Sequence, residues 1–292
     1  MEYQKKYEEY LRRTEDRLTL LCDRYLPETS LTARAARYSL FGGGKRVRAI
    51  LVQAACEMLG GDPEPAADFS AAVEMLHCYS LIHDDLPCMD NDDYRRGRLS
   101  CHKAFDEATA LLAGDALLTE ALEAAANAPF SPQVQAQAVR LLAGGAGLGG
   151  MILGQELDLK YEAQSATEAQ LLQVHRHKTG ALIEAALQMG AAAAGATEED
   201  KAALKTYGYG LGLVFQIVDD VLDVTATQEE LGKPIGSDAQ QGKTTFVTLY
   251  GVQGAMEYAR KVNDQACAAL QGYGERAEFL LTMAQKLIER KK

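Results

Sequence analysis

Aspartates gather in two short segments of this chain, and both segments are rich in groups that bind cations. The first, residues 83–93, reads HDDLPCMDNDD and holds five aspartates within ten positions. It follows an apolar stretch, residues 73–82, with the composition of a buried helix. On a regular helix Asp84 and Asp90 would point about 240° apart, so both can face one ligand only if Pro87 ends the helix and the chain turns back.

The second segment, residues 215–223, reads FQIVDDVLD and lies inside an apolar stretch with helical spacing. Asp219 and Asp223 are four residues apart and therefore share a helix face, with Gln216 about one turn earlier. Unpaired carboxylates among such apolar neighbours are costly, so a cation is expected to meet them. A solvated acidic helix end is the alternative for the first segment, but the apolar flanks argue against it for the second. Mg²⁺, which binds carboxylate and phosphate oxygens together, is the expected partner.

Basic residues occur in glycine-containing segments that suit phosphate groups. Residues 41–48 read FGGGKRVR, a glycine turn before an expected helix start, where backbone N–H groups and basic side chains can hold phosphate oxygens. The segment is not a nucleotide P-loop, because arginine follows Lys45 and the GxxxxGK spacing is absent. Further positive charge comes from residues 94–98 (YRRGR) and 175–180 (HRHKTG), and from lysines 233 and 243 after the second acidic segment.

Two other kinds of site are poorly supported. His175 and His177 are two residues apart, diverge on a helix and have no cysteine nearby, which argues against zinc. A serine hydrolase would need a G-x-S-x-G turn and strands to carry it, and the sequence favours neither. His77 lies about two turns before Asp84 and could join the same cleft, although a lone histidine is more often a core residue.

Helices are the elements that must position these residues. Alanine, leucine, glutamate and glutamine recur with helical spacing, which predicts an almost all-α chain. Two stretches, 139–156 and 181–196, hold small residues with few polar interruptions and are predicted to be helices buried on most sides. A length of 292 residues fits one large domain or two modest ones. The breaks are short turns rather than long linkers, so we predict one domain, residues 1–292.

The charge balance limits the class of partner. With 30 Lys and Arg against 41 Asp and Glu the net charge is -11, which disfavours nucleic acid and anionic membrane but is compatible with a small anionic substrate in a locally basic cleft. The six cysteines are scattered and form no CxxC pair, as expected for reduced thiols. The first residues are densely charged, unlike a secretory leader, and no apolar run reaches the ~20 residues of a membrane span. We therefore expect a cytoplasmic protein.

Taken in order, these segments resemble a known family. GGGKRVR, HCYSLIHDDLPCMDNDDYRRG, GQELDL, HRHKTG, FQIVDDVLD and LGKPIGSD with GKTT are similar to the motif series of the trans-isoprenyl diphosphate synthases, or polyprenyl synthetases, and most of all to the bacterial farnesyl diphosphate synthases. The series spans Gly42 to Thr245. The resemblance implies an isoprenoid synthase-type bundle of helices around a deep central cavity, a homodimer, and a cluster of about three Mg²⁺ ions per site.

Carried over position by position, the resemblance implies metal ligands at Asp84, Asp85, Asp90, Asp219, Asp220 and Asp223. Isopentenyl diphosphate is expected at Lys45, Arg48, His77 and Arg96, and the allylic diphosphate at Arg95, Lys178, Lys233 and Lys243. Catalysis is expected to involve the first five of those aspartates together with Lys178, Thr179 and Gln216. Ala49 stands where the family usually has proline, a departure expected to affect helix entry more than chemistry.

The activity that the resemblance implies is head-to-tail condensation of isopentenyl diphosphate with an allylic diphosphate. Tyr79 and Ser80 lie just before the first acidic segment, and Tyr79 is about 7.5 Å down a helix from Asp84. In the family a bulky residue there accompanies the fifteen-carbon product, so farnesyl diphosphate is expected. A geranylgeranyl diphosphate synthase and a non-catalytic subunit that binds prenyl diphosphates are the alternatives. A terpene cyclase would have no need of a second diphosphate site.

Overall fold

The chain folds as a bundle of helices with one very short hairpin. The computed structural model describes residues 2–162, 164–225 and 243–290. Within these residues the helices are α1 (Glu2–Tyr25), α2 (Leu31–Leu40), α3 (Val47–Met58), α4 (Pro63–Asp84), α5 (Cys101–Ala104), α6 (Glu107–Ala126), α7 (Pro132–Ala146), α8 (Met151–Glu162), α9 (Glu168–His175), α10 (Ala181–Ala194), α11 (Glu198–Thr225), α14 (Phe246–Ala268) and α15 (Glu278–Ile288). A π-helical turn, η1 (Arg176–Gly180), joins α9 to α10, and a 3₁₀ segment, η2 (Gln271–Ala277), precedes α15. The expectation of an all-α fold is confirmed.

Side-chain caps decide where many of these helices begin. Asp62 accepts a hydrogen bond from the Glu64 amide, and Pro63 occupies the first turn of α4, where its missing N–H costs nothing. Asp106 accepts from the Thr109 amide at the start of α6. Threonines 167 and 245 form reciprocal capping boxes at the starts of α9 and α14.

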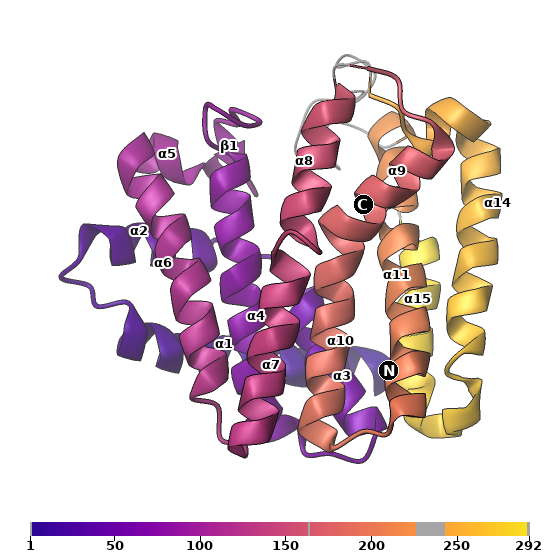
Figure 1. Ribbon diagram of the computed structural model, residues 1–292, viewed down its shortest axis with the longest axis horizontal. Coiled ribbons are helices and arrows are strands. Elements are labelled where there is room, and N and C mark those ends of the chain that lie inside the picture. Colours follow the sequence, from indigo (N-terminus) through magenta and orange to yellow (C-terminus); the bar gives the residue numbers. More distant parts are fainter. Residues whose placement is uncertain (1, 163, 226–242, 291–292) are drawn as a thin grey trace.

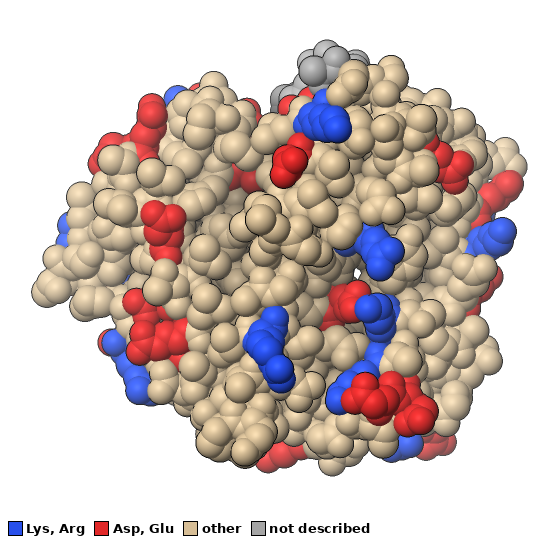
Figure 2. Space-filling view, in the orientation of Figure 1, with Lys and Arg blue, Asp and Glu red and all other residues tan. Residues whose placement is uncertain are grey.

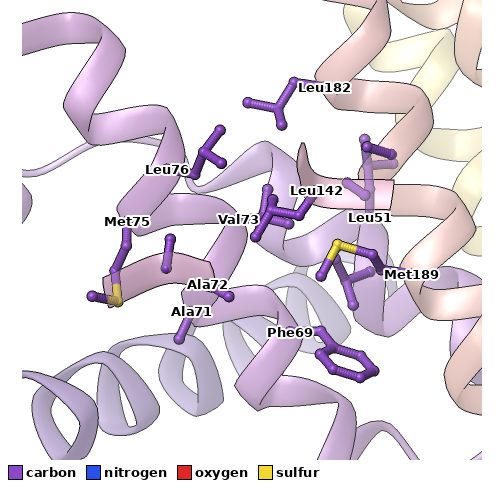
Figure 3. Packing of buried hydrophobic residues seen from close by; sticks show 14 of the residues in the cluster. Leu51, Phe69, Ala71, Ala72, Val73, Met75, Leu76, Leu142, Leu182 and Met189 are labelled. Atoms are coloured by element: carbon purple, nitrogen blue, oxygen red, sulfur yellow. The ribbon is translucent and has the colours of Figure 1, made fainter. Parts of the chain in front are cut away.

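The core forms around α4, which is enclosed by other helices along most of its length. Leu51 of α3, Val73 of α4, Leu142 of α7, and Leu182 and Met189 of α10 converge there, all fully buried (Figure 3). The neighbouring helices come close because their contact positions are small. A Cβ atom at Gly190 of α10 would lie 2.2 Å from the carbonyl oxygen of Val52, so only glycine allows this approach to α3.

The stretch predicted as one buried helix over residues 139–156 is two helices, and that prediction is wrong. The chain leaves the helix at Gly147, whose ψ of -161° is extended, and helix resumes at Met151. Leu148 and Ile152 are exposed, so this part of the chain is not buried on most sides. By length and composition alone Pro132–Glu162 would suffice to cross a membrane, but the glycine break divides it and α7 packs on α10.

Both acidic segments reach the same end of the bundle. Helices α4 and α11 run toward the upper end in Figure 1, where the hairpin of β1 (Tyr94–Arg95) and β2 (Arg98–Leu99) also lies. The turn of this hairpin has positive φ at Arg96 (53°) and Gly97 (74°), the geometry of a tight two-residue turn that matches strand twist. The hairpin folds the basic segment 94–98 back over the end of α4.

Candidate active site

The end of α4 is shaped by a turn that brings two aspartates together. The helix stops at Asp84, three residues before Pro87, as expected from the sequence. The Asp90 amide then donates to the carbonyl oxygen of Asp84 at 2.8 Å, and Asn91, with φ of 54°, bonds back to Leu86. The chain therefore reverses direction, which allows the Asp84 and Asp90 side chains to face the same ligand.

Asp85 is held by an arginine from the hairpin. Nε of Arg95 lies 2.8 Å from Oδ1 and 2.9 Å from Oδ2 of Asp85, and Nη2 lies 2.5 Å from Oδ1. The carboxylate is buried, and burial raises its pKa while Arg95 opposes the rise. In the structure Arg95, assigned from the resemblance to the allylic diphosphate, thus pairs with a predicted metal ligand.

Asp84 faces a lysine from another part of the fold. Its Oδ1 accepts from Nε2 of Gln155 on α8 at 2.8 Å. Burial raises the pKa of Asp84 to about 6, the charge of Lys178 opposes the rise, and the charge of Asp90 adds to it. Lys178 comes from η1, so the π-helical turn places this positive charge near the first acidic segment.

One face of α8 organises the site, and the sequence reasoning missed it. Gln155, Asp158 and Glu162 are three and four residues apart and so share a face. Asp158 pairs with Lys178 at 2.5 Å, and Glu162 pairs with Lys243 at 2.5 Å. The spacing within residues 155–162 was the available signal, because it places three polar side chains on one side of the helix.

The second acidic segment lies on the last turns of α11. Asp219 pairs with Arg290, which follows α15, at 2.7 Å. Asp220 accepts from the Phe246 amide at 2.9 Å and so sits at the N-terminus of α14, where a negative charge is favoured. Asp223 is buried on the same helix face as Asp219. The Arg290 contact was not foreseen, because the arginine is 71 residues away in sequence.

A cavity of about 430 Å³ opens beside this segment. Thr179 of η1 donates its hydroxyl to Oε1 of Gln216, so these two predicted residues do meet. The cavity brings together part of the predicted allylic site with the second acidic segment, and its polar lining includes Asp158, Glu162, Lys178, Gln216, Asp219, Asp220, Asp223, Lys243 and Arg290. Among the described residues, no three His, Cys, Asp or Glu side chains already converge as a metal site. Lys233 lies outside the described residues.

The residues assigned to isopentenyl diphosphate form a separate basic group. Nη1 of Arg48 lies 3.2 Å from Nε2 of His77, and the Arg96 guanidinium donates to the carbonyl oxygen of Gly43 in the glycine turn. Nε of Arg48 and Nδ1 of His77 are buried and have no hydrogen-bond partner among the described residues. Burial and the charge of Arg48 hold the pKa of His77 well below its usual range, so the imidazole is neutral.

The three basic residues of the glycine turn, Lys45, Arg46 and Arg48, have different surroundings. Arg46 is buried and pairs with Glu15 at 2.7 Å and Glu74 at 3.6 Å, so it ties the turn to the core. Lys45 is exposed, and its carbonyl oxygen accepts from the Tyr7 hydroxyl at 2.5 Å. The buried guanidinium of Arg46 therefore serves the fold. Arg48 lies beside His77, and the role of the exposed Lys45 in holding isopentenyl diphosphate stays a prediction.

The two residues assigned to product length differ in their surroundings. Tyr79 is buried, and burial together with the charge of Asp84 raises its pKa to about 12. Ser80 donates its hydroxyl to the His77 carbonyl oxygen of its own helix at 2.8 Å. Tyr79 thus lies near the acidic segment, and the Ser80 hydroxyl is engaged by its own backbone.

The face in Figure 2 carries basic and acidic side chains singly or in mixed groups, without a continuous basic surface on this side. The convergent basic groups described above instead lie at the two predicted substrate positions. This distribution matches a small anionic ligand better than a polyanion.

This chain is similar to known proteins in sequence. The family model for polyprenyl synthetase matches residues 29–278. A farnesyl diphosphate synthase from Micrococcus luteus is 41% identical over 272 residues, covering 93% of this chain and 94% of that one. A chloroplastic geranylgeranyl pyrophosphate synthase from Capsicum annuum is 43% identical over 267 residues, covering 90% and 72%.

Solved structures are similar over nearly the whole chain. A geranyltransferase from Legionella pneumophila superposes with a TM-score of 0.89 at 38% identity, covering 99% of both chains. A geranyltransferase from Helicobacter pylori, described as complexed with magnesium and isoprenyl diphosphate, gives a TM-score of 0.83 at 34% identity, covering 97% and 96%. With matching motifs, fold and sequence along its length, this chain belongs to the polyprenyl synthetase family.

Proposed function

We propose that this prenyltransferase condenses isopentenyl diphosphate head to tail with dimethylallyl or geranyl diphosphate and releases farnesyl diphosphate and diphosphate. The observation that carries the proposal is the presence of two anion positions with different chemistry. One is the basic group of Arg48, His77 and Arg96, with buried nitrogen atoms that lack partners among the described residues. The other is the aspartate-lined cavity that contains Lys178.

The residues present fit Mg²⁺. Two groups of carboxylates lie at one end of the bundle, and the burial that raises the pKa of Asp84 to about 6 is a cost that a bound cation would remove. The holders would be Asp84, Asp85, Asp90, Asp219, Asp220 and Asp223. When bound, Mg²⁺ supplies neutralisation of the charge that grows on the departing diphosphate. A relative described as complexed with magnesium supports the assignment, and we propose three ions per site.

The chain's own residues then have separate tasks. Lys178 and Lys243 orient the allylic diphosphate and offset its charge as the bond from carbon to oxygen breaks. The hydroxyl of Thr179 and the amide of Gln216, already in contact, direct their dipoles toward the allylic cation that remains. Arg48, His77 and Arg96 hold isopentenyl diphosphate so that its double bond attacks the cation. The proton then lost passes to the released diphosphate, and the surrounding helices exclude water from the cation.

The product is proposed to have fifteen carbons because Tyr79 is a bulky, buried residue one turn before the first aspartates. Relatives argue for a second candidate, since several geranylgeranyl diphosphate synthases are as similar to the chain as the farnesyl enzyme is, at 43% to 46% identity. The experiment is incubation of the purified protein with isopentenyl diphosphate and either dimethylallyl or geranyl diphosphate, with products sized by chromatography.

Each outcome of that incubation separates the candidates. A fifteen-carbon product supports the farnesyl assignment, and a twenty-carbon product replaces it with geranylgeranyl diphosphate synthase. Binding of prenyl diphosphate without turnover, in the presence of Mg²⁺, would indicate the non-catalytic subunit instead. Removal of divalent cations with a chelator should stop turnover, and added Mg²⁺ should restore it.

We further propose that the protein acts as a cytoplasmic homodimer. Leu111 and Leu112 on α6, and Leu148 and Ile152 around the start of α8, are large apolar side chains exposed to solvent. A second copy of the chain would cover such side chains. Sedimentation analysis should give a dimer, and Leu148→Glu should shift it toward monomer; a monomeric unaltered protein would overturn this proposal.

A further inference from the structure

His83 precedes the first aspartate pair, yet its side chain turns toward the neighbouring helix α6. Its Nε2 lies 2.9 Å from the carbonyl oxygen of Leu111. The ring occupies the space beside Gly114, where a Cβ atom would lie 2.1 Å from Nε2 and 2.4 Å from Cδ2. Because Gly114 has no side chain, it leaves a notch in the surface of α6, and the His83 imidazole fills this notch.

The same ring contacts Tyr79 one turn earlier on α4. The two ring centroids are 5.6 Å apart at an interplanar angle of 83°, an edge-to-face arrangement. Tyr79 is buried, and it lies close enough to Asp84 for the carboxylate charge to raise the pKa of the phenol further after burial. His83 thus touches α6 on one side and the proposed floor of the product cavity on the other.

This contact lies at the C-terminal end of α4, which Gln155 and Arg95 also contact through Asp84 and Asp85. The helix ends at Asp84, and the carbonyl oxygen of Asp84 bonds the returning Asp90 amide instead of a further helical turn. The orientation of the last turn of α4, and of the Asp84 and Asp85 side chains, therefore depends on contacts with neighbouring elements. A hydrogen bond from His83 to the backbone of α6 is such a contact.

We propose that His83, which packs into the space beside Gly114, is a positioning residue that fixes the end of α4 against α6. It thereby sets the orientation of the Asp84 and Asp85 side chains and the position of the Tyr79 ring. The proposal rests on the proposed function. It assigns a task to Gly114 as well, because alanine there must expel the imidazole. His83 and Gly114 therefore act as one unit.

The test uses four variants of the full-length protein: His83→Ala, His83→Gln, Gly114→Ala and the double variant His83→Ala with Gly114→Ala. Gly144→Ala is the matched control, since a Cβ atom on that helical glycine of α7 meets nothing within 4 Å. Three quantities are measured: the product-length ratio, the Mg²⁺ concentration for half-maximal rate, and the affinity for Mg²⁺ with inorganic diphosphate by calorimetry.

His83→Ala and Gly114→Ala should each raise the Mg²⁺ requirement and weaken calorimetric binding by roughly 10-fold or more, as loss of a ligand-orienting contact does. Each should also shift products toward longer chains. The double variant should match His83→Ala within about 2-fold, because residues that act as a unit are not additive. His83→Gln, whose amide can reach the Leu111 carbonyl, should recover part of the Mg²⁺ affinity.

The proposal is overturned if folded His83→Ala keeps the normal Mg²⁺ affinity and product ratio, or if the two single effects simply multiply in the double variant. An effect of Gly144→Ala as large as that of Gly114→Ala would also overturn it. Failure of the proposed function can be distinguished from failure of this inference. In that case the unaltered protein would make no prenyl product, while calorimetric binding of Mg²⁺ with diphosphate could still be compared among the variants.

Discussion

At the scale of single residues, several predicted site residues pair with charged partners in the folded chain. Asp85 meets Arg95, Asp219 meets Arg290, and Lys178 meets Asp158. The sequence indicated the aspartates and basic residues and placed Arg95 close to the first acidic segment. It did not indicate the pairing of Asp219 with Arg290, which are 71 residues apart, or of Lys178 with Asp158, which depends on how α8 and η1 pack. The assignments of metal and substrate roles stay predictions that mutation can test.

Asp84→Ala and Asp219→Ala should each lower the condensation rate by at least ~10²-fold, comparable to the loss of a main electrostatic stabiliser. The reason is that each removes a carboxylate from one of the two proposed metal-binding groups. Steady-state kinetics at saturating Mg²⁺ measures the effect. Asp16→Ala on the exposed side of α1 is the control and should leave the rate unchanged. A near-normal rate in either active-site variant would contradict the assignment.

Arg48→Ala should raise the KM for isopentenyl diphosphate at least ~10-fold with little change for the allylic substrate. Arg48 belongs to the basic group with His77, whereas the allylic diphosphate is assigned to the cavity with Lys178. Separate titrations of the two substrates measure the difference, with the exposed Arg12→Ala as control. An equal rise for both substrates would mean that the two positions are wrongly divided.

Asp84 should make the metal-free protein less stable as the pH rises. Its pKa is raised from 3.8 to about 6 by burial, so the folded state binds more protons than the unfolded state between those values. Stability is therefore lost as the pH rises from about 4 to 6, by roughly 3 kcal/mol at most, and the loss is complete above about 6. With chelator present, Asp84→Asn should raise the free energy of unfolding at pH 7.5 but not at pH 4. Equal effects at both pH values would count against the shift.

At the scale of elements, helix type and several boundaries could be predicted because their signals are local. Pro87 after the first aspartates and the glycine turn before Val47 act on their immediate neighbours. The break after Ala146 was missed, since glycine in an alanine-rich stretch is compatible with a continuing helix until packing decides. The π-helical turn at residues 176–180 was missed as well, because its extra residue is fixed by contacts with α8 and α11.

Gly154→Ala should disturb that turn selectively. A Cβ atom at Gly154 would lie 2.0 Å from the backbone nitrogen of Lys178, so α8 and η1 must separate. We expect a loss of about 1–3 kcal/mol in the free energy of unfolding, typical of overpacking, together with a higher KM for the allylic substrate. Thermal unfolding and kinetics measure both, and Gly144→Ala serves as control. Unchanged stability would show that η1 is not held by this contact.

At the scale of the whole molecule, the bundle and the convergence of both acidic segments at one end could be expected once the motif order was recognised. The product length was predicted from Tyr79 alone, because the motif series does not separate the two product classes. Relatives with either product length are about equally similar to this chain. That packing around Tyr79 sets the product length therefore stays a prediction.

Tyr79→Ala should lengthen the product from fifteen carbons to twenty or more, because the buried ring no longer closes the cavity. The substitution costs roughly 3–5 kcal/mol if the site does not collapse, so the fold is checked by circular dichroism. Chromatography of the products measures the change, and Tyr79→Phe, which keeps the ring, should retain the fifteen-carbon product. A folded Tyr79→Ala variant with an unchanged product would exclude Tyr79 as the floor.

The pairing of the site's own cations with its own carboxylates has a consequence for selectivity. Arg95, Lys178 and Arg290 already hold Asp85, Asp158 and Asp219. A ligand that draws one of these cations away from its carboxylate gains only the difference between two ion pairs. For an anion of low charge, the free energy of this exchange is close to zero. A multivalent anion that binds together with divalent cations pairs with the released Lys or Arg, while the divalent cations pair with the released carboxylate. We therefore expect the site to discriminate by ionic valence, so that a prenyl alcohol or monophosphate with the same hydrocarbon tail leaves the internal pairs closed.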